Sequence, residues 1–350
     1  MELQIFLLLV EDGLTVGAVY ILLATALVMV FNVTRIVFVP QGDFVAYAAL
    51  TLAAFDAHIL PPTAWLAAIS GWLAWIMDVA GFLRSGERRL MPFLRSTALF
   101  IVVPGLIFTL AWFAIRGTES VTLNIALSIA IITSLAPSVY RIAFRPIADA
   151  SPLVLLIAAI SVHFIFRGLG LYMFGPEGVR TKTIEAPPVF MGPLVVPSSA
   201  IVIVVACAIL IVGLYLFFDK TIYGKALRAA AISRRGAQLM GISTDLAGSL
   251  TLTLAAFVGS VSGVLIAPLM TISYSSGFVL ALKGFVGAIV GGLAAYPLAA
   301  AGALLVGLLE SFASYWVSSY KEAIVFLMII PILLWRSLLA THVEEEEPEV

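Results

Sequence analysis

The chain has 350 residues, of which 62% are hydrophobic and only 11% are charged, and its formal net charge is −1. Soluble domains are about 45–50% apolar and about 25% charged, so this composition and a mean hydropathy of +1.13 exclude an ordinary water-soluble protein. A helix that spans a bilayer needs about 20 predominantly apolar residues, and such stretches recur along the whole chain. We therefore expect an all-α polytopic helical membrane protein with about 8–11 transmembrane helices, some of them broken or re-entrant.

Apolar runs predict the helices in chain order. They cover residues 5–31, 41–57, 63–83, 97–116, 121–140, 151–173, 197–218, 245–272, 278–295, 297–318 and 322–340. The first run begins MELQIFLLLVEDGLTVG and lacks the basic region of a signal peptide, so we expect it to be retained as a membrane helix. We predict one transmembrane domain over 1–340, an ordered external loop over the Pro- and Gly-rich 174–196, and a solvated acidic tail at 341–350.

Basic residues concentrate in three polar connections. Residues 84–95 hold four arginines, residues 141–149 hold Arg141 and Arg145, and residues 219–235 hold five Lys and Arg side chains. Cytoplasmic loops carry an excess of Lys and Arg, and two predicted helices separate each connection from the next, so all three are predicted to be cytoplasmic. This topology places the N-terminus outside and the C-terminus in the cytoplasm of a bacterial inner membrane.

Sequence motifs for chemistry are missing. No G-x-x-x-x-G-K-[ST] occurs, and His58, His163 and His342 have no metal-ligand spacing. Cys207 is the only cysteine and lies in an apolar run, where packing is its expected role. We therefore expect no cofactor, no metal and no catalytic residue, and transport is favoured over catalysis.

Ionisable residues within apolar segments are costly and indicate function by default. Asp56, Asp78 and Lys283 fall near predicted helix ends, where an interfacial position is expected, whereas Glu310 lies in mid-helix and serves either packing or transport. Gln41 and Asp43 follow an interruption at Pro40 and Gly42, and broken backbone at membrane depth is tolerated only where protein buries it or a cavity is lined. The predicted substrate pathway therefore contains Gln41, Asp43 and Glu310.

A glycine-rich segment follows at residues 284–307, GFVGAIVGGLAAYPLAAAGALLVG. Glycines at three- and four-residue spacing allow helix backbones to approach closely. Close packing alone explains this pattern, and a short interrupted helix pair lining a cavity, with Gly291 and Gly292 on the pathway, is the alternative.

Residues 218–243, FDKTIYGKALRAAAISRRGAQLMGIS, are basic and rich in small residues. If 224–237 is one helix, a small-residue face contains Ala226, Ala230, Ser233 and Ala237, and a basic face contains Lys225, Arg228 and Arg235. This pattern suits either a loop on lipid headgroups or a surface that docks a partner.

The same stretch resembles the cytoplasmic coupling loop of permease subunits of branched-chain amino acid ABC importers. That family has a Gly-x-Ala-x-Arg-Ala core and an Ala-x-x-x-Gly-Ile close, which read here Gly224, Ala226, Arg228 and Ala229, then Ala237, Gly241 and Ile242. Residues 13–34, 144–162 and 282–311 resemble other family segments in the same order, so that the resemblance covers about 13–57 and 141–340. Two regions depart from the family: Phe38–Asp43 replaces an Asn-Phe-Ala-His-Gly-Glu type sequence, and residues 58–140 match no family segment.

The resemblance implies a permease subunit that lies in the lipid bilayer. It works there with separate cytoplasmic ATPases, a second permease subunit (identical or paralogous) and a periplasmic binding protein, and no nucleic-acid partner is implied. It implies that 219–243 is the coupling segment for the ATPases, through Gly224, Ala226, Arg228, Ala229, Ala230, Ala237 and Gly241. The implied cargo is a branched-chain or other hydrophobic amino acid, with urea, short amides and aromatic acids as alternatives. An ion-coupled secondary transporter, with Asp43 or Glu310 binding the ion, is the competing class, and a lipid-modifying enzyme would need a polar cluster at one interface.

Overall fold

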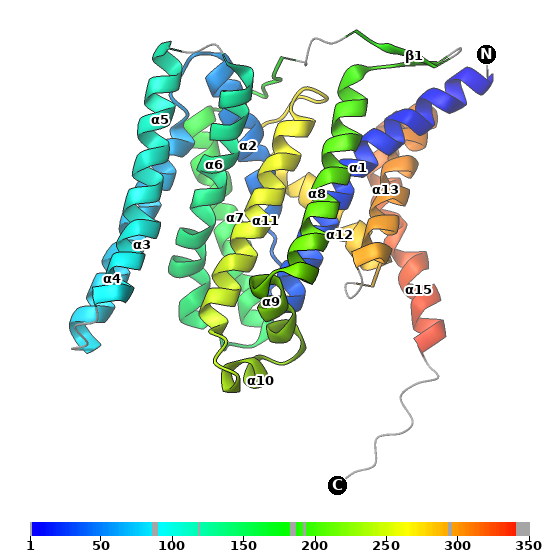
Figure 1. Cartoon of the computed structure of the whole chain (residues 1–350). Coiled ribbons are helices and arrows are strands. Elements are labelled where there is room, and N and C mark those ends of the chain that lie inside the picture. The colour runs from blue at the N-terminus through cyan, green and yellow to red at the C-terminus, as the bar shows by residue number, and fades with distance from the viewer. Residues whose placement is uncertain are drawn as a thin grey trace.

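The computed structural model describes residues 2–85, 90–117, 120–182, 187–191, 194–292 and 296–340. Within these ranges, eight helices are long and apolar enough to cross a membrane. Figure 1 shows them side by side as a bundle, with the N-terminus and the β-hairpin at one end and α4, α9 and α10 at the other. The expected all-α polytopic fold is confirmed. The predicted acidic tail and residues 86–89 of the 84–95 connection lie outside the described residues.

The first half of the chain forms α1 (Glu2–Thr34), α2 (Gln41–Asp56), α3 (Pro62–Ser85), α4 (Leu90–Thr97), α5 (Val103–Gly117), α6 (Val121–Val139) and α7 (Pro152–Phe174). A π-helical turn, Ala98–Val102, joins α4 to α5. A second π-helical turn, Tyr140–Phe144, extends α6 and is followed by the 3-10 turn Arg145–Ile147.

The second half begins with the antiparallel hairpin of β1 (Val189–Met191) and β2 (Leu194–Val196), in which Val189 pairs with Val196. The helices that follow are α8 (Ser198–Lys220), α9 (Ile222–Ile232), α10 (Arg234–Leu239), α11 (Thr244–Ile266), α12 (Ser276–Val290), α13 (Tyr296–Trp316), the 3-10 turn Ser318–Tyr320, α14 (Lys321–Leu327) and α15 (Ile329–Ala340).

Three predicted boundaries were wrong, each for a local reason. The segment 224–237 is two helices rather than one, because Ser233 is extended and its side chain accepts a hydrogen bond from Gly236 N, which caps α10. The helix predicted over 245–272 ends at Ile266, just before Pro268, which has no N–H to donate. The helix predicted over 322–340 is divided between α14 and α15, because Pro331, in the first turn of α15, has no N–H to donate to the carbonyl oxygen of Leu327.

Small residues allow the central helices to approach closely. An added Cβ on Gly17 of α1 would lie 3.3 Å from Leu304 Cα of α13, and one on Gly287 of α12 would lie 2.6 Å from Ala303 Cα. Close packing of small residues replaces the hydrophobic driving force that is absent between helices in lipid. The close-packing interpretation of the glycine-rich segment is thus confirmed.

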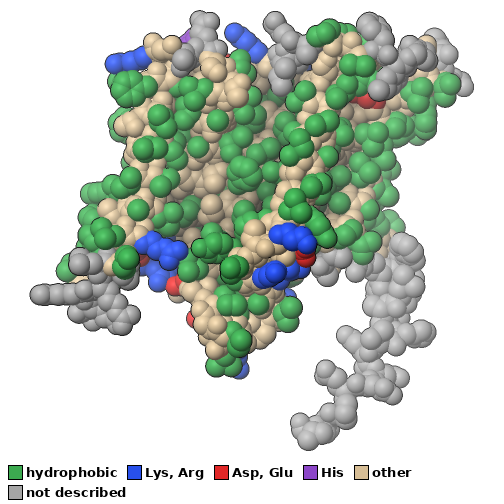
Figure 2. Space-filling model, viewed as in Figure 1, with side chains coloured by type: hydrophobic (Ala, Val, Ile, Leu, Met, Phe, Trp, Pro, Cys, Tyr) green, Lys and Arg blue, Asp and Glu red, His purple; other side chains and the backbone are tan. Residues whose placement is uncertain are grey.

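Figure 2 shows how side chains distribute over one face of the molecule. A broad band of apolar side chains covers the middle, and blue Lys and Arg side chains gather toward the two ends. This distribution is the one that a bilayer imposes on a spanning protein.

Candidate functional site

A buried polar cluster lies at the start of α2, where the interruption at Pro40 was predicted. Gln41 and Asp43 are 0% and 2% exposed. An added Cβ on Gly42 would lie 2.6 Å from the carbonyl carbon of Gly277, so the starts of α2 and α12 meet backbone to backbone. Helix N-termini carry partial positive charge, and the carboxylate of Asp43 lies in the first turn of α2.

His163 of α7 is the partner of Asp43. Its Nδ1 lies 2.8 Å from Asp43 Oδ2, and the imidazole is 3% exposed. Its ring centroid lies 5.0 Å from that of Phe278 in the first turn of α12. The sequence offers no metal-ligand spacing for His163, and its pairing with Asp43 was not predicted; its position within an apolar helix was the signal that could have identified it.

Gln41 ties the same cluster to α11. Its Nε2 donates to the carbonyl oxygen of Ala255 at 2.9 Å. Its Oε1 is buried and has no hydrogen-bond partner among the described residues. A buried acceptor without a partner is costly, so Gln41 Oε1 is available to a hydrogen-bond donor. The cluster therefore combines an unpartnered acceptor, Gln41 Oε1, with the Asp43 carboxylate, which is hydrogen-bonded to the His163 imidazole.

A second cluster joins α1, α12 and α13. Lys283 forms a buried ion pair with Glu310, and Tyr20 OH donates to the other carboxylate oxygen of Glu310 at 2.7 Å. The expected interfacial position of Lys283 was wrong, because this side chain is 3% exposed in the middle of α12. An unpaired ammonium would be costly to bury at this depth, and the Glu310 carboxylate compensates the charge of Lys283.

The other predicted pathway residues lie elsewhere. Gly291 follows the last residue of α12 and contacts Leu298 and Ala299 of α13, and Gly292 has a φ of 79°, in the left-handed region. Gln41 and Asp43 lie together at the start of α2, whereas Glu310 belongs to the cluster with Lys283 and Tyr20. Their role in a pathway stays a prediction.

Two aspartates sit at the ends of the bundle. Asp56 is the last residue of α2 and accepts a hydrogen bond from Lys182 N at 3.5 Å. Asp78 of α3 is 13% exposed and forms an ion pair with Arg141, and its other neighbours include Ser96, whose hydroxyl donates to it at 2.6 Å.

The α9–α10 segment packs inward through its small residues. Thr221 and Ser233 cap its two helices by accepting hydrogen bonds from Gly224 N and Gly236 N. Leu227, Ala230 and Ala237 are buried in a cluster with Val33 of α1 and Ala247 of α11. The expectation that the small-residue face meets a partner is therefore corrected for Ala230 and Ala237, which are 2% and 3% exposed.

The outward face of this segment carries different residues. We call its exposed apolar side chains the outer ridge: Ile222, Tyr223, Ile232, Leu239 and Met240. Of the predicted coupling residues, Gly224 is also buried, Ala226 and Ala229 are half-buried, and Arg228 and Gly241 are exposed. Lys225, Arg228 and Arg235 face outward, as the basic face was expected to.

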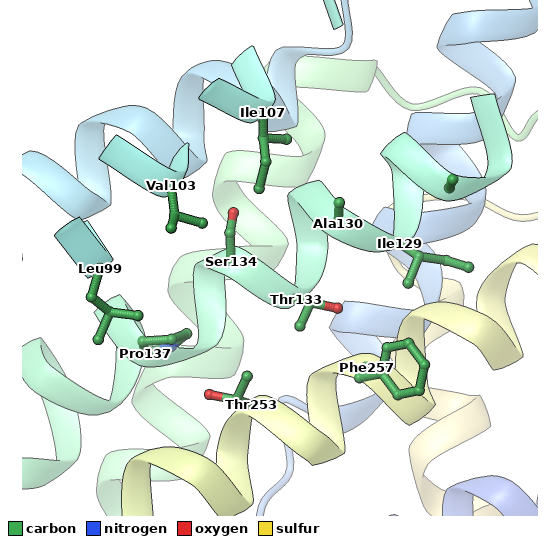
Figure 3. A pocket seen from close by; sticks show the side chains of 11 residues that line it. Leu99, Val103, Ile107, Ile129, Ala130, Thr133, Ser134, Pro137, Thr253 and Phe257 are labelled. Atoms are coloured by element: carbon green, nitrogen blue, oxygen red, sulfur yellow. The ribbon is translucent and has the colours of Figure 1, made fainter. Parts of the chain in front are cut away.

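A pocket of about 380 Å³ lies between α5, α6 and α11. Figure 3 shows apolar side chains such as Val103, Ile107 and Phe257 around it, with the hydroxyls of Thr133, Ser134 and Thr253 as the polar groups. No charged residue lines it. An amino acid has an ammonium and a carboxylate that need partners when buried, so this pocket does not suit such a cargo.

The fold and these clusters define a polytopic α-helical membrane protein with ionisable groups buried between its helices. The chain belongs to the family described as branched-chain amino acid transport system / permease component, which matches residues 9–333.

Individual relatives agree with this assignment. The chain is 31% identical to the high-affinity branched-chain amino acid transport system permease protein LivH of Escherichia coli over 209 residues. This match covers 56% of this chain and 66% of LivH. It is 30% identical over 234 residues to BraD, a permease protein of the same description from Pseudomonas aeruginosa, which covers 64% of this chain and 76% of BraD. The match to LivH thus spans just under two thirds of that relative's length. The solved structure of PsaBC from Streptococcus pneumoniae in complex with Fab matches with a TM-score of 0.37 and 13% identity, over 93% of this chain and 89% of that one, a likeness too low to bear on the fold.

Proposed function

We propose that this chain is the membrane-spanning subunit of an ATP-driven importer that carries branched-chain or other hydrophobic amino acids into the cell. The family and the printed names of LivH and BraD support this function. In this proposal the chain sits in a bacterial inner membrane, pairs with a second permease subunit, receives cargo from a periplasmic binding protein, and is driven by cytoplasmic ATPases that hydrolyse ATP on their own subunits.

The observation that carries the proposal is the outer ridge of α9–α10. Ile232 and Leu239 are 86% and 89% exposed on a short segment at one end of the bundle, beside exposed basic side chains. Apolar side chains that stand out together from a polar segment mark a contact surface. The inner face of the same segment packs on α1 and α11, so a force applied to the ridge reaches both helices. We therefore propose that the ATPase docks on this ridge, with Arg228 at its edge.

Substitution on the ridge tests the proposal. Ile232→Glu places a charge where an apolar contact is expected, and loss of a central interface residue costs about 2 kcal/mol or more, so the affinity for the ATPase should fall about thirtyfold or more. Gln238→Glu, an exposed position on α10 that is already polar, is the matched control. The measurement is co-purification of co-expressed ATPases with the tagged chain. Equal retention by Ile232→Glu and wild type would show that the ridge only lies on lipid.

The buried Asp43–His163 pair favours a second candidate, an ion-coupled transporter in which this pair binds a proton. Uptake by Asp43→Asn cells separates the two. An ATP-driven importer needs no titrating group, so this variant should transport more slowly without losing accumulation. Complete loss of accumulation at normal expression, together with collapse of wild-type uptake by a protonophore at constant ATP, would favour the ion-coupled class.

Cargo identity is testable outside the membrane. We propose that Gln41, Asp43, Gly291, Gly292 and Glu310 contribute to the pathway, and that the periplasmic binding protein sets most of the selectivity. Calorimetric binding of leucine, isoleucine and valine to that protein, compared with urea, short amides and aromatic acids, identifies the cargo class. Tight binding of an alternative and none of the three amino acids would overturn the cargo proposal and leave the ATP-driven mechanism standing.

A further inference from the structure

A network of charged side chains joins three elements at the α9–α10 end of the bundle. Arg145 donates through Nε to Asp245 Oδ2 at the start of α11, at 2.7 Å, and its Nη1 lies 3.4 Å from Asp78 Oδ1 of α3. Arg141 forms an ion pair with the same oxygen of Asp78. Arg145 therefore sits between two carboxylates on different helices, one close and one farther away.

The turn that carries Arg145 is also attached to α10. Arg234 Nη1 donates to the carbonyl oxygen of Ala148 at 2.9 Å. Ala148 N in turn donates to the carbonyl oxygen of Arg145 at 3.3 Å. A displacement of α10 is thus passed to Arg145 through two hydrogen bonds.

This turn has the features of a hinge. Arg141 lies in the π-helical turn Tyr140–Phe144, and Arg145 lies in the 3-10 turn that follows it. Changes of helix type within one continuous segment mark hinges and functional sites. An added Cβ on Gly248 of α11 would lie 2.6 Å from ring atoms of Tyr140, so the hinge packs tightly on α11.

The hinge reaches the buried cluster through aromatic rings. Phe144, the last residue of the π-helical turn, has its ring centroid 5.8 Å from that of Phe38. Phe38 lies 5.7 Å, centroid to centroid, from Phe44 of α2 and belongs to the stretch that leads into Gln41 and Asp43. All three rings are fully buried, so movement of one displaces the others.

We propose that Arg145 is a positioning residue that couples the α9–α10 segment to the Gln41–Asp43–His163 cluster. The Tyr140–Ile147 stretch is the hinge between them, and this inference rests on the proposed function. Coupling requires an element with two discrete arrangements that both sites bias. Arg145 touches both carboxylates, through Nε to Asp245 at 2.7 Å and through Nη1 to Asp78 at 3.4 Å, and in this proposal a small shift of its turn tightens one contact at the expense of the other. Arg145 and Asp245 are 36% and 46% exposed, so their pair contributes little to stability and can rearrange readily.

Transport per ATP hydrolysed tests this role in the complete complex. Wild type, Arg145→Gln, Arg145→Lys and Asp245→Asn are reconstituted with their ATPases and binding protein in proteoliposomes, and uptake of the identified amino acid is measured beside ATP hydrolysis. Arg145→Gln should retain the ATPases and hydrolyse ATP while transport per ATP falls about threefold or more, the scale of coupling changes along such networks. Arg145→Lys, which keeps the charge, should recover part of the loss, and Asp245→Asn should show the same defect as Arg145→Gln.

Controls separate positioning from a structural role. Arg116→Gln removes an exposed cation–π contact with Trp112 near the end of α5, outside the α9–α10 segment, and should leave transport per ATP unchanged. Unaltered transport per ATP in both Arg145→Gln and Asp245→Asn overturns the inference, and so does a proportional loss of melting temperature, ATPase retention and hydrolysis in both. Failure of the wild-type chain to retain any ATPase overturns the proposed function instead.

Discussion

Individual buried charges in this protein are compensated by partners on other helices. The ammonium of Lys283 meets Glu310 and lies 5.7 Å from the centroid of the Tyr20 ring, while Tyr20 OH satisfies the second carboxylate oxygen. An isolated charge in this place would be costly, and a pair is tolerated only when its remaining hydrogen-bonding groups are also satisfied. The three side chains thereby specify how α1, α12 and α13 sit against one another.

Removing one charge of this pair should cost more than removing both. Lys283→Met leaves Glu310 buried and unpaired, which costs about 3–5 kcal/mol. The double variant Lys283→Met/Glu310→Gln leaves no net charge and should recover most of that loss. Thermal unfolding of the detergent-purified chain, followed by size-exclusion chromatography, measures the difference.

Tyr20→Phe is the matched control, because it removes one hydrogen bond and keeps both charges, at about 1 kcal/mol. A double variant that unfolds at the same temperature as Lys283→Met would mean that packing of the lysine stem, and not charge compensation, holds these helices together.

At the scale of elements, α9 and α10 depend on the rest of the protein for their existence. They contain 11 and 6 residues, and helices shorter than about 12–15 residues are marginal in water on their own. Two side-chain caps and the buried contacts of Leu227, Ala230 and Ala237 hold them. The segment is therefore a rigid extension of α1 and α11, which is what transmission of force requires.

Ala230→Glu should loosen this attachment. The side chain is 2% exposed against Val33 and Ala247, and overpacking a filled site costs about 1–3 kcal/mol before the added burial of a charge is counted. We expect a lower melting temperature and faster trypsin cleavage at Arg228 and Arg234. Ile232→Glu, two residues away and 86% exposed, should leave both measurements unchanged. Equal protease resistance in the two variants would contradict the inward packing of α9.

The limits of sequence-based prediction follow from the kind of information that each feature needs. Long apolar runs specify the spanning helices locally, and the proline and glycine at 40 and 42 identified the interruption before Asp43. The partner of Asp43 is 120 residues away in the chain, and no local pattern encodes that pairing. Periodicity predicted that Ala226, Ala230 and Ala237 share a face, but it could not show that Ala230 and Ala237 pack inward, because small residues suit both an internal contact and a partner.

The two ends of the molecule carry different elements. The end that carries α9 and α10 also carries the Arg141 and Arg145 network and Arg234, whereas the opposite end carries the N-terminus and the β-hairpin. The helices that flank the three predicted basic connections end on the α9–α10 side of the bundle. This agrees with the prediction that two membrane crossings separate each connection from the next. Which end faces the cytoplasm stays a prediction from the excess of Lys and Arg.

Labelling of single cysteines tests that orientation. In a Cys207→Ser background, Gln238→Cys places an exposed thiol on α10, and Lys182→Cys places one at an exposed position beside Asp56, at the end of α2. The native Cys207 is 2% exposed, so its removal eliminates background without disturbing a surface contact. We expect a membrane-impermeant maleimide added to intact cells to modify Lys182→Cys and to leave Gln238→Cys unmodified until the cells are opened, because the basic end should face the cytoplasm. A permeant maleimide should modify both and serves as the control for reactivity. Modification of Gln238→Cys from outside, with Lys182→Cys protected, would invert the topology and exclude ATPase docking on the outer ridge.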